Sequence, residues 1–325
     1  MKTFLKILKW LGIVIALLLV ILVISTYAMW QRKFEAPYPD IHASTDSAVI
    51  AHGEYLVYGP AHCAECHLAM TDMEKFKAGE KTPLSGGFEF KLPFGTIQSR
   101  NLTSDKETGL GRYSDAEIAR LLRQQVRPNG RTMIPFMEYQ NMSDADLTAI
   151  VSYLRSLPPV KKEIPEAQWN FMGKAVMAFL IKPEGPQGTP PKSVQPEVTV
   201  EYGKYLADDV SNCKGCHTER SMKTGEYIGI PFGGGLKAEA STGEKGVFVV
   251  SQNITTDKQF GKLASWDADH FVNRFHQGIL IPQSIMPWAS FQHYSDNDLK
   301  AIYRYLVTIP PVNFDPGPAL VKEAN

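Results

Sequence analysis

The chain has 325 residues, with 34 Lys and Arg against 34 Asp and Glu, so its formal net charge is zero at pH 7. This balance argues against a nucleic-acid-binding protein, which needs a surplus of basic residues to neutralise phosphates. Hydrophobic residues make up 44% of the sequence, which excludes a disordered chain, and the length leaves room for about two domains of roughly 100–200 residues each.

A basic segment and then a long apolar segment open the sequence. Residues 1–9 contain three lysines, and residues 10–30 carry no charge and are long enough to cross a bilayer as a helix. Trp10, Tyr27 and Trp30 stand at the ends of this run, where aromatic rings anchor at membrane interfaces. A cleaved signal peptide is the alternative, but the apolar run is longer than is typical of one. The sequence therefore predicts an uncleaved anchor with its N-terminus in the cytoplasm, because the lysines precede the span.

The remainder of the sequence repeats itself. Four segments of the first half have counterparts in the second: HGEYL and YGKYL, CAECH and CKGCH, NLTSD and NITTD, and the endings SDADL and SDNDL, each followed by PPV. This repetition predicts two tandem domains, at 45–160 and 197–313. The other segments are a juxtamembrane linker at 31–44, a proline-rich linker at 161–196 with a short apolar helix at 169–181, and a tail at 314–325. We expect that short helix to pack on a domain, with contact to the membrane surface as the alternative.

The periodicity of apolar residues predicts that each domain is mostly helical. A first helix is expected to end at each cysteine pair, and a middle helix to cover residues 114–127 and 267–277. Ser143 and Ser295 open the last helices with capping sequences. Segments rich in Gly and Pro between the helices predict loops. The expected fold is therefore all-α, with a transmembrane helix before two helical domains.

The four cysteines form two Cys-x-x-Cys-His motifs: Cys63, Cys66 and His67, and Cys213, Cys216 and His217. This spacing is the attachment signature of c-type haem, in which two thiols one helical turn apart bond to the two vinyl groups of a porphyrin and the adjacent His binds the iron. A zinc site would need four ligands, a thioredoxin-like motif would need a βαβ context, and disulfides would not explain the His after both pairs. The motifs therefore predict two covalently attached haem c groups.

The sequence around the motifs resembles the class I cytochrome c domains of membrane-associated multihaem cytochromes, including the cytochrome subunits of bacterial membrane-bound alcohol and gluconate dehydrogenases. The resemblance covers about 45–160 and 197–313. It is carried by CAECH and CKGCH, NLTSD and NITTD, SDAE and WDAD, MPW, and the SDxDL…YL…PPV endings. It implies small helical domains wrapped around covalent haem, with His67 and His217 as the proximal iron ligands.

The distal iron ligand in this family is usually a Met on the loop before the last helix, and Met/His ligation raises the reduction potential. In the second domain Met286, in a Met-Pro-Trp segment, matches that position. In the first domain the matching position is Ile134, so the resemblance favours Met137, in a Pro-Phe-Met segment. Met133 is the alternative, and Met142 or the lack of a Met ligand also remains open.

The expected function is electron transfer from a quinol- or substrate-oxidising complex to a terminal acceptor or oxidase, by a carrier tethered to the bacterial inner membrane with its haem domains in the periplasm. If His and Met bind both irons, no position is left for substrate, so we expect a carrier and not an enzyme. A non-catalytic subunit of a membrane-bound dehydrogenase is the first alternative, and a dihaem enzyme acting on peroxide or a sulfur compound is the second. The expected partners are the membrane and redox proteins such as a dehydrogenase, an oxidase or a soluble cytochrome.

Several polar residues near the motifs carry weaker predictions. Asn101 and Asn253 begin possible glycosylation sequons, but their repetition at matching points favours a shared loop structure. Arg100 is a candidate to neutralise a haem propionate. Five histidines are expected on the polar surface: His52, His62, His270, His276 and His293.

Overall fold

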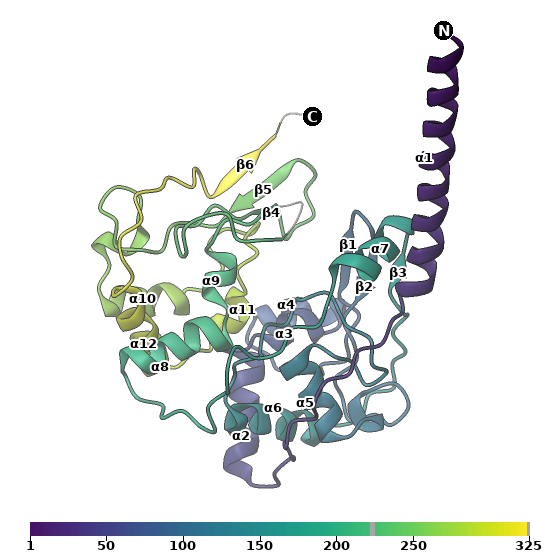
Figure 1. The fold of residues 1–325 in the computed structure, drawn as a ribbon. Coiled ribbons are helices and arrows are strands. Elements are labelled where there is room, and N and C mark those ends of the chain that lie inside the picture. The colour runs from purple at the N-terminus through teal and green to yellow at the C-terminus, as the bar shows by residue number, and fades with distance from the viewer. Residues whose placement is uncertain (222–224, 324–325) are drawn as a thin grey trace.

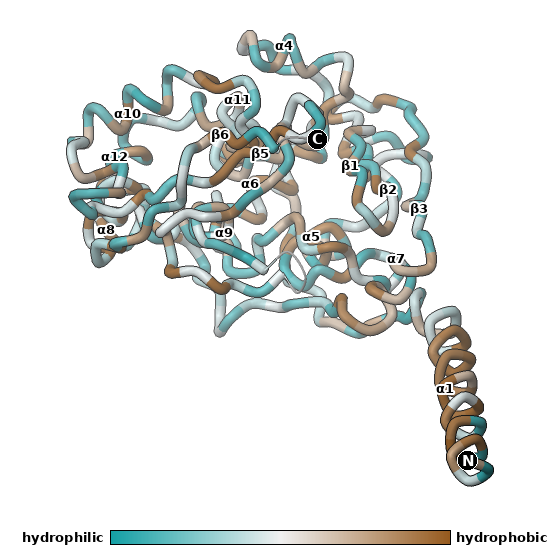
Figure 2. Tube along the Cα trace, turned by 90° about the horizontal axis from the view of Figure 1, so that it is seen from above, coloured by the Kyte–Doolittle hydropathy of each residue, from teal (hydrophilic) through white to brown (hydrophobic). Residues whose placement is uncertain are grey.

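The structure, a computed structural model, describes residues 1–221 and 225–323. Its N-terminal helix α1 (Lys2–Met29) projects away from the rest of the molecule (Figure 1). Within the described residues, α1 is the one helix long and apolar enough to cross a membrane, with a mean hydropathy of 3.0 over an 18-residue window that is 0% buried. The Thr26 hydroxyl in this helix donates to the backbone oxygen of Leu22, so it needs no external partner. Figure 2 shows hydrophobic residues along most of α1, so the predicted apolar span is one continuous helix that fits a membrane anchor.

Two groups of helices follow α1, and their members come in a similar order along the chain (Figure 1). The first group comprises α2 (Ser47–Tyr58), α3 (Cys63–His67), the 3-10 turn η1 (Met70–Asp72), α4 (Met73–Lys77), the 3-10 turn η2 (Leu110–Arg112), α5 (Asp115–Gln124) and α6 (Asp144–Ser156). The second group comprises α8 (Val200–Tyr205), the π-helical turn η4 (Leu206–Val210), α9 (Cys213–Cys216), the 3-10 turn η5 (Lys262–Ser265), α10 (Ala268–His276), α11 (Trp288–Phe291) and α12 (Asp296–Leu306).

A break separates the first helix of each group from its cysteine pair, where we expected one helix to end at the motif. His62 and Asn212, directly before the first cysteine of each pair, adopt left-handed backbone with φ of 41° and 51°. A left-handed residue does not continue a right-handed helix, so α3 and α9 begin anew after it. The Asn212 side chain then accepts a hydrogen bond from the backbone N–H of Gly215 at 3.0 Å, which caps α9. Each cysteine pair therefore lies on a short helix of its own.

The predicted caps of the last helices are confirmed. The Ser143 hydroxyl accepts a hydrogen bond from the backbone N–H of Asp146 at 3.0 Å, and that of Ser295 accepts one from Asp298 at 3.2 Å. Each bond satisfies an amide that has no partner within the helix. These caps fix the start of α6 and α12 at matching points of the two groups.

The first and last helices of each group cross at a glycine. A Cβ atom at Gly53 of α2 would lie 1.9 Å from the backbone oxygen of Ala149 of α6. A Cβ atom at Gly203 of α8 would lie 1.9 Å from the backbone oxygen of Ala301 of α12. These distances leave no room for a side chain, so only glycine allows the two backbones to approach this closely. The two groups thus pack their terminal helices in the same way.

The regular structure is mostly helical, as expected, but the described residues also form two small antiparallel sheets that the all-α expectation omitted. The first sheet has the order β1-β2-β3, and the second has the order β4-β5-β6. Their strands are β1 (Glu89–Leu92), β2 (Gly95–Gln98), β3 (Gln168–Trp169), β4 (Lys237–Glu239), β5 (Val247–Val250) and β6 (Leu320–Lys322). β3 belongs to the proline-rich linker and β6 to the C-terminal tail. The third strand of each sheet therefore comes from a distant part of the chain, which no local sequence pattern reveals.

The apolar stretch of the linker forms the predicted short helix. It consists of α7 (Phe171–Ala175) and the π-helical turn η3 (Val176–Leu180). Both parts contact the C-terminal end of α1, and α7 also contacts β3 of the first sheet (Figure 1). The helix therefore packs on the folded part of the molecule, as expected, and on the base of α1 as well.

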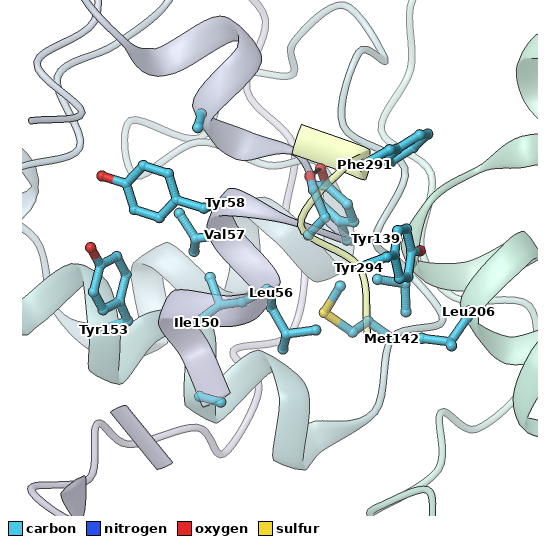
Figure 3. Close-up of a cluster of buried hydrophobic side chains, with 14 of the residues drawn as sticks. Leu56, Val57, Tyr58, Tyr139, Met142, Ile150, Tyr153, Leu206, Phe291 and Tyr294 are labelled. Carbon is cyan, nitrogen blue, oxygen red and sulfur yellow. Dashed lines mark hydrogen bonds between the residues drawn. The ribbon is translucent and has the colours of Figure 1, made fainter. Parts of the chain in front are cut away.

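The two groups of helices share one continuous hydrophobic core. Figure 3 shows Leu56 and Met142 of the first group beside Leu206, Phe291 and Tyr294 of the second, all of them buried. Full burial of a Leu or Phe side chain stabilises a fold by about 1.5–3 kcal/mol. The shared core therefore holds the two groups together as one unit.

Two matching sets of hydrogen bonds also join the groups. Tyr55 of α2 donates to the Asp298 carboxylate at 2.5 Å and accepts from the N-cap amide of α12 at 3.0 Å. Tyr205 of α8 donates to the Asp146 carboxylate at 2.5 Å and accepts from the N-cap amide of α6 at 3.0 Å. Each tyrosine thus binds the last helix of the opposite group, as equivalent residues do across a two-fold symmetric interface.

His52, which bonds to Asp146 beside the Tyr205 contact, makes the stability of the fold depend on pH. Its Nε2 lies 2.6 Å from the Asp146 carboxylate, and this hydrogen bond raises the pKa of His52 above its usual value, although burial opposes the shift. A raised pKa in the folded state stabilises the fold fully below the unfolded pKa of about 6.5. The contribution is lost as the pH rises through the folded pKa of His52.

We expect His52→Gln to flatten the dependence of stability on pH. Urea unfolding of the purified protein between about pH 6 and about pH 9 should show a smaller fall in the free energy of unfolding for the variant than for the wild type. His276→Gln is the matched control, because His276 forms an exposed pair with Asp296 at 2.9 Å. An unchanged slope in His52→Gln would show that this bond does not contribute to stability.

Candidate functional site

The cysteine pair of the second group opens onto a cavity of about 420 Å³. Cys213, Cys216 and His217 line this cavity, and so does Met286, which lies 69 residues beyond His217 in the sequence. Apolar side chains form much of the remaining wall, among them Leu263, Phe271, Phe275, Trp288 and Leu306. The structure therefore brings the predicted thioether, proximal and distal residues of the second domain into one apolar pocket.

Both motif histidines have the same orientation. His67 Nδ1 lies 2.7 Å from the backbone oxygen of Arg100, and His217 Nδ1 lies 2.8 Å from that of Gln252. Because a carbonyl oxygen only accepts, the proton of each ring is on Nδ1 and the lone pair of Nε2 is left for a metal. Burial also lowers the pKa of both rings, which keeps them neutral. This arrangement fits a proximal ligand of iron.

The four cysteines form no disulfide with one another. Burial raises the pKa of Cys63, Cys66 and Cys213 to about 12, and it also raises the pKa of Cys216. Redox-active cysteines in Cys-x-x-Cys motifs have lowered pKa values instead. In residues 1–221 and 225–323, no group of three or more His, Cys, Asp or Glu side chains is arranged to hold a metal ion. The raised pKa values argue against a thioredoxin-like redox pair, and the apolar wall of the second cavity fits a porphyrin.

The cysteine pair of the first group lies beside a tyrosine. Tyr139 is buried, and its hydroxyl donates to the backbone oxygen of Ala61 at 2.5 Å, next to Cys63. Met137 packs against the same core cluster as Cys63, whereas Met133 is 8% exposed and is buried outside that cluster. This placement is in keeping with Met137 as the distal ligand, which stays a prediction.

Ile134, the position equivalent to Met286, does not line a cavity with the cysteine pair of its own group. It lines a small cavity together with Trp30, Arg131 and Trp169, at the base of α1. The loop around it therefore differs from the Met286 loop of the second group. This local difference explains why the ungapped alignment of the two repeats does not identify the ligand of the first domain.

The two cysteine sites contact each other through residues that the sequence did not single out as functional. His62, which we expected on the polar surface, instead lines the cavity of the second site and packs edge-on against Phe291, with ring centroids 5.5 Å apart. That expectation was wrong, because the left-handed turn before Cys63 directs His62 into the opposite group. The first site thus supplies part of the wall of the second.

A hydrogen bond and an ion pair also join each cysteine site to the opposite group. Glu65, between the cysteines of α3, accepts a hydrogen bond from the backbone N–H of Ser290 at 2.9 Å. Arg220, just after α9, forms an ion pair with Glu138 at 3.4 Å. Glu138 and Ser290 occupy equivalent positions in the two repeats, since they lie three residues after Pro135 and Pro287, which follow the equivalent positions Ile134 and Met286. Each cysteine site therefore contacts the segment that follows position 134 or 286 in the other group. Alignment of the two repeats would have shown that these two segments are equivalent.

The two repeated Asn-x-Thr/Ser loops are confirmed as a shared structural feature. Asn101 and Asn253 are buried, at 2% and 0% exposure. Each accepts a hydrogen bond from the backbone N–H two residues later at 3.0 Å. Each also donates to the backbone after the last helix, at Val160 and Val312 respectively. These buried side chains tie the loop to the end of the last helix in both groups.

Arg100 has partners in the linker. Its guanidinium lies 2.8 Å from the Glu166 carboxylate and donates to the backbone oxygen of Ile164 at 2.8 Å. Its backbone oxygen meanwhile holds His67. The residue therefore connects the first cysteine site to the linker, and its expected role toward a haem propionate stays a prediction.

Residues 51–158 match the model of the cytochrome c family. The chain is 29% identical to the cytochrome c subunit of a quinone alcohol dehydrogenase from Gluconobacter oxydans, over 82% of this chain and 56% of the relative. It is 28% identical to the cytochrome c subunit of gluconate 2-dehydrogenase from Pantoea cypripedii, over 81% of this chain and 60% of the relative. The chain thus covers little more than half the length of these relatives. It is also 24% identical to a dihaem c-type cytochrome from Cereibacter sphaeroides, over 63% of this chain and 68% of the relative.

Proposed function

Because residues 51–158 form a cytochrome c domain and the chain is homologous to cytochrome c subunits of dehydrogenases, we propose that this protein is an electron carrier with two covalent haem c groups. The first haem belongs to the domain at 45–160 and the second to a tandem domain at 197–313. The observation that carries the proposal is the repeated Cys-x-x-Cys-His helix, in which each His presents Nε2 in the same way.

At each site, the cysteines would attach the haem and the axial ligands would bind its iron. Cys63 and Cys66 would bind the first haem as thioethers, and Cys213 and Cys216 would bind the second. His67 and His217 would be the proximal iron ligands, and Met286 would be the distal ligand in the second domain. A bound haem c supplies one-electron chemistry, and its axial ligands set the potential. If His and Met occupy the axial positions of both irons, no position is left for substrate, and the protein is a carrier and not an enzyme.

Contact between the two sites supports transfer between them. His62, adjacent to Cys63, lines the cavity of Cys213 and Cys216, and Glu65 of α3 accepts a hydrogen bond from α11, the short helix that follows Met286. A shared core and paired tyrosine contacts hold the groups in this arrangement. The two proposed haem sites are therefore adjacent in the folded protein, so an electron could pass between them without diffusion of the domains.

The helix α1 would hold the carrier at a membrane. Three lysines lie in residues 1–9, before the apolar span, and this bias places the N-terminus in the cytoplasm by the positive-inside rule. The two domains would then lie in the bacterial periplasm, at the inner membrane. The anchor confines the carrier to the surface where membrane-bound partners work.

The names of the relatives indicate the class of partner. They are cytochrome c subunits of dehydrogenases that act on an alcohol and on gluconate. This chain would receive electrons from a substrate- or quinol-oxidising complex, as a bound subunit or as a mobile carrier, and deliver them to an oxidase or another acceptor. Co-purification from a mild detergent extract distinguishes the subunit from the mobile carrier.

Redox titration and electron paramagnetic resonance of the purified full-length protein test the proposal. We expect two haems per chain, both low-spin, each taking up one electron reversibly. Stable binding of carbon monoxide to the reduced protein, or turnover of peroxide, would contradict the carrier and favour the enzyme.

Met286→Ala extends this test to one ligand. Because the cysteines are unchanged, both haems should stay attached, while the potential of one falls by on the order of 0.1 V, a fraction of the span of about 0.8 V that axial ligands cover. Met70→Leu is a control, since Met70 is exposed. Of Met137→Ala and Met133→Ala, only the variant that removes the ligand of the first haem should lower the other potential, and we expect that variant to be Met137→Ala. Unchanged potentials in Met286→Ala would refute its assignment.

A further inference from the structure

The linker helix (Phe171–Leu180) has one buried face and one exposed apolar face. Gly173, Met177 and Ala178 are buried, and a Cβ atom at Gly173 would lie 2.2 Å from the backbone oxygen of Phe94. This close approach seats the helix firmly on the first sheet. On the other side, four large apolar side chains are exposed to between 37% and 67%: Phe171, Met172, Phe179 and Leu180. Such a concentration of exposed apolar side chains marks an interaction surface.

The exposed face lies at the base of α1. Phe171 packs against Tyr27 with ring centroids 6.3 Å apart, and Lys174 lies over the rings of Tyr27 and Trp30 at 4.7 and 5.3 Å. Arg32, just after α1, donates to the backbone oxygen of Ile181 at 3.5 Å. Aromatic rings and basic side chains of this kind gather where a membrane helix enters the headgroup region. The linker helix is thus held at the level where α1 would leave the bilayer.

We propose that the linker helix lies in the headgroup region of the membrane and makes a second, non-spanning contact with phospholipid. This inference rests on the proposed membrane span of α1. The linker helix is too short to cross a bilayer, which needs about 20 residues. Its apolar side chains would enter the boundary between headgroups and acyl chains, as those of interfacial helices do. Lys174 and Lys182 would face the lipid phosphates.

The contact has a consequence for the redox domains. β3, directly before the linker helix, pairs with β2 through Gly95 and Trp169, so the helix is fixed to the first domain. A single span allows the domains to rotate about its end. A second contact at the membrane surface restricts that rotation and gives the cysteine sites a defined orientation for a membrane-bound partner.

Depth-dependent quenching tests the proposal in the full-length holoprotein. Each variant carries one introduced cysteine, Leu180→Cys, Leu17→Cys or Ala51→Cys, labelled with an environment-sensitive fluorophore and reconstituted into vesicles of phosphatidylcholine and phosphatidylglycerol. The native cysteines carry haem in the proposed protein, so the introduced thiol is the reactive one. Leu17 lies in the middle of α1, and exposed Ala51 lies on α2, at the end of the molecule that points away from α1 (Figure 1).

We expect a spin label near the lipid headgroups to quench Leu180→Cys at least twice as strongly as a label at the middle of the acyl chains does. Leu17→Cys should show the reverse preference, and Ala51→Cys should be quenched by neither. Serine substitution of Met172 and Phe179 in the Leu180→Cys background should reduce the quenching at least by half.

The outcomes separate the two proposals. Quenching of Leu17→Cys without quenching of Leu180→Cys would overturn the interfacial contact and leave the span intact. Absence of quenching at Leu17→Cys would overturn the span itself. Equal quenching of Leu180→Cys and Ala51→Cys would also refute a specific contact of the linker helix.

Discussion

Replacing Cys213 and Cys216 by serine should reduce the covalent haem content from two groups per chain to one. The thioether bonds of the second site would be lost, while Cys63 and Cys66 remain to hold the first haem. The apolar walls of a cavity of about 420 Å³ would then lose their permanent occupant, so we also expect the second group of helices to become sensitive to proteolysis. Intact mass under denaturing conditions counts the attached haems.

Lys214→Ala is the matched control for this variant, because Lys214 lies between the two cysteines and is exposed. It should retain both haems. The converse variant, Cys63→Ser with Cys66→Ser, should also retain one haem. A mass that still corresponds to two covalent haems in Cys213→Ser/Cys216→Ser would show that the second motif is not an attachment site.

Gly203→Ala should destabilise the second group of helices by about 3 kcal/mol, at the upper end of the usual cost of overpacking. The added Cβ atom would meet the backbone oxygen of Ala301 at 1.9 Å, and a main-chain atom in a packed helix has little freedom to move. The helices α8 and α12 would have to separate where they cross. Guanidinium unfolding followed by far-ultraviolet circular dichroism measures the loss.

A second glycine and an exposed residue provide the comparison. Gly53→Ala should destabilise the first group by a similar amount, because its Cβ atom would meet Ala149 at the same distance. Glu201→Ala, on the exposed side of α8, should change stability by less than about 0.5 kcal/mol. Equal stability of Gly203→Ala and the wild type would mean that the two helices separate without cost, contrary to the close packing.

The paired contacts between the groups bear on how the two sites work together. Tyr55 and Tyr205 each bond to the last helix of the opposite group, and Glu65 bonds to α11, the short helix that follows Met286. Of these contacts, that of Glu65 comes directly from a cysteine helix, because Glu65 lies between Cys63 and Cys66 on α3. The first cysteine site is therefore joined by a hydrogen bond to the segment that follows Met286.

The sequence by itself determined the local structure around the cysteine motifs and predicted the chemistry proposed for them. Two Cys-x-x-Cys-His motifs, the caps at Ser143 and Ser295, and the repeated asparagine loops follow from residues close together in the chain. Short-range hydrogen bonds and helical periodicity depend on few neighbours, so the sequence pattern expresses them directly. The apolar N-terminal helix was predictable for the same reason.

Only the tertiary structure decided how these parts meet. β3 and β6 pair with strands far away in the sequence, His62 enters the cavity of the opposite group, and the linker helix settles at the base of α1. Each of these contacts depends on the relative placement of whole elements, which the packing of a shared core selects. Local patterns carry no information on that placement, because the same strand or exposed histidine is compatible with many neighbours until the core brings one of them into reach.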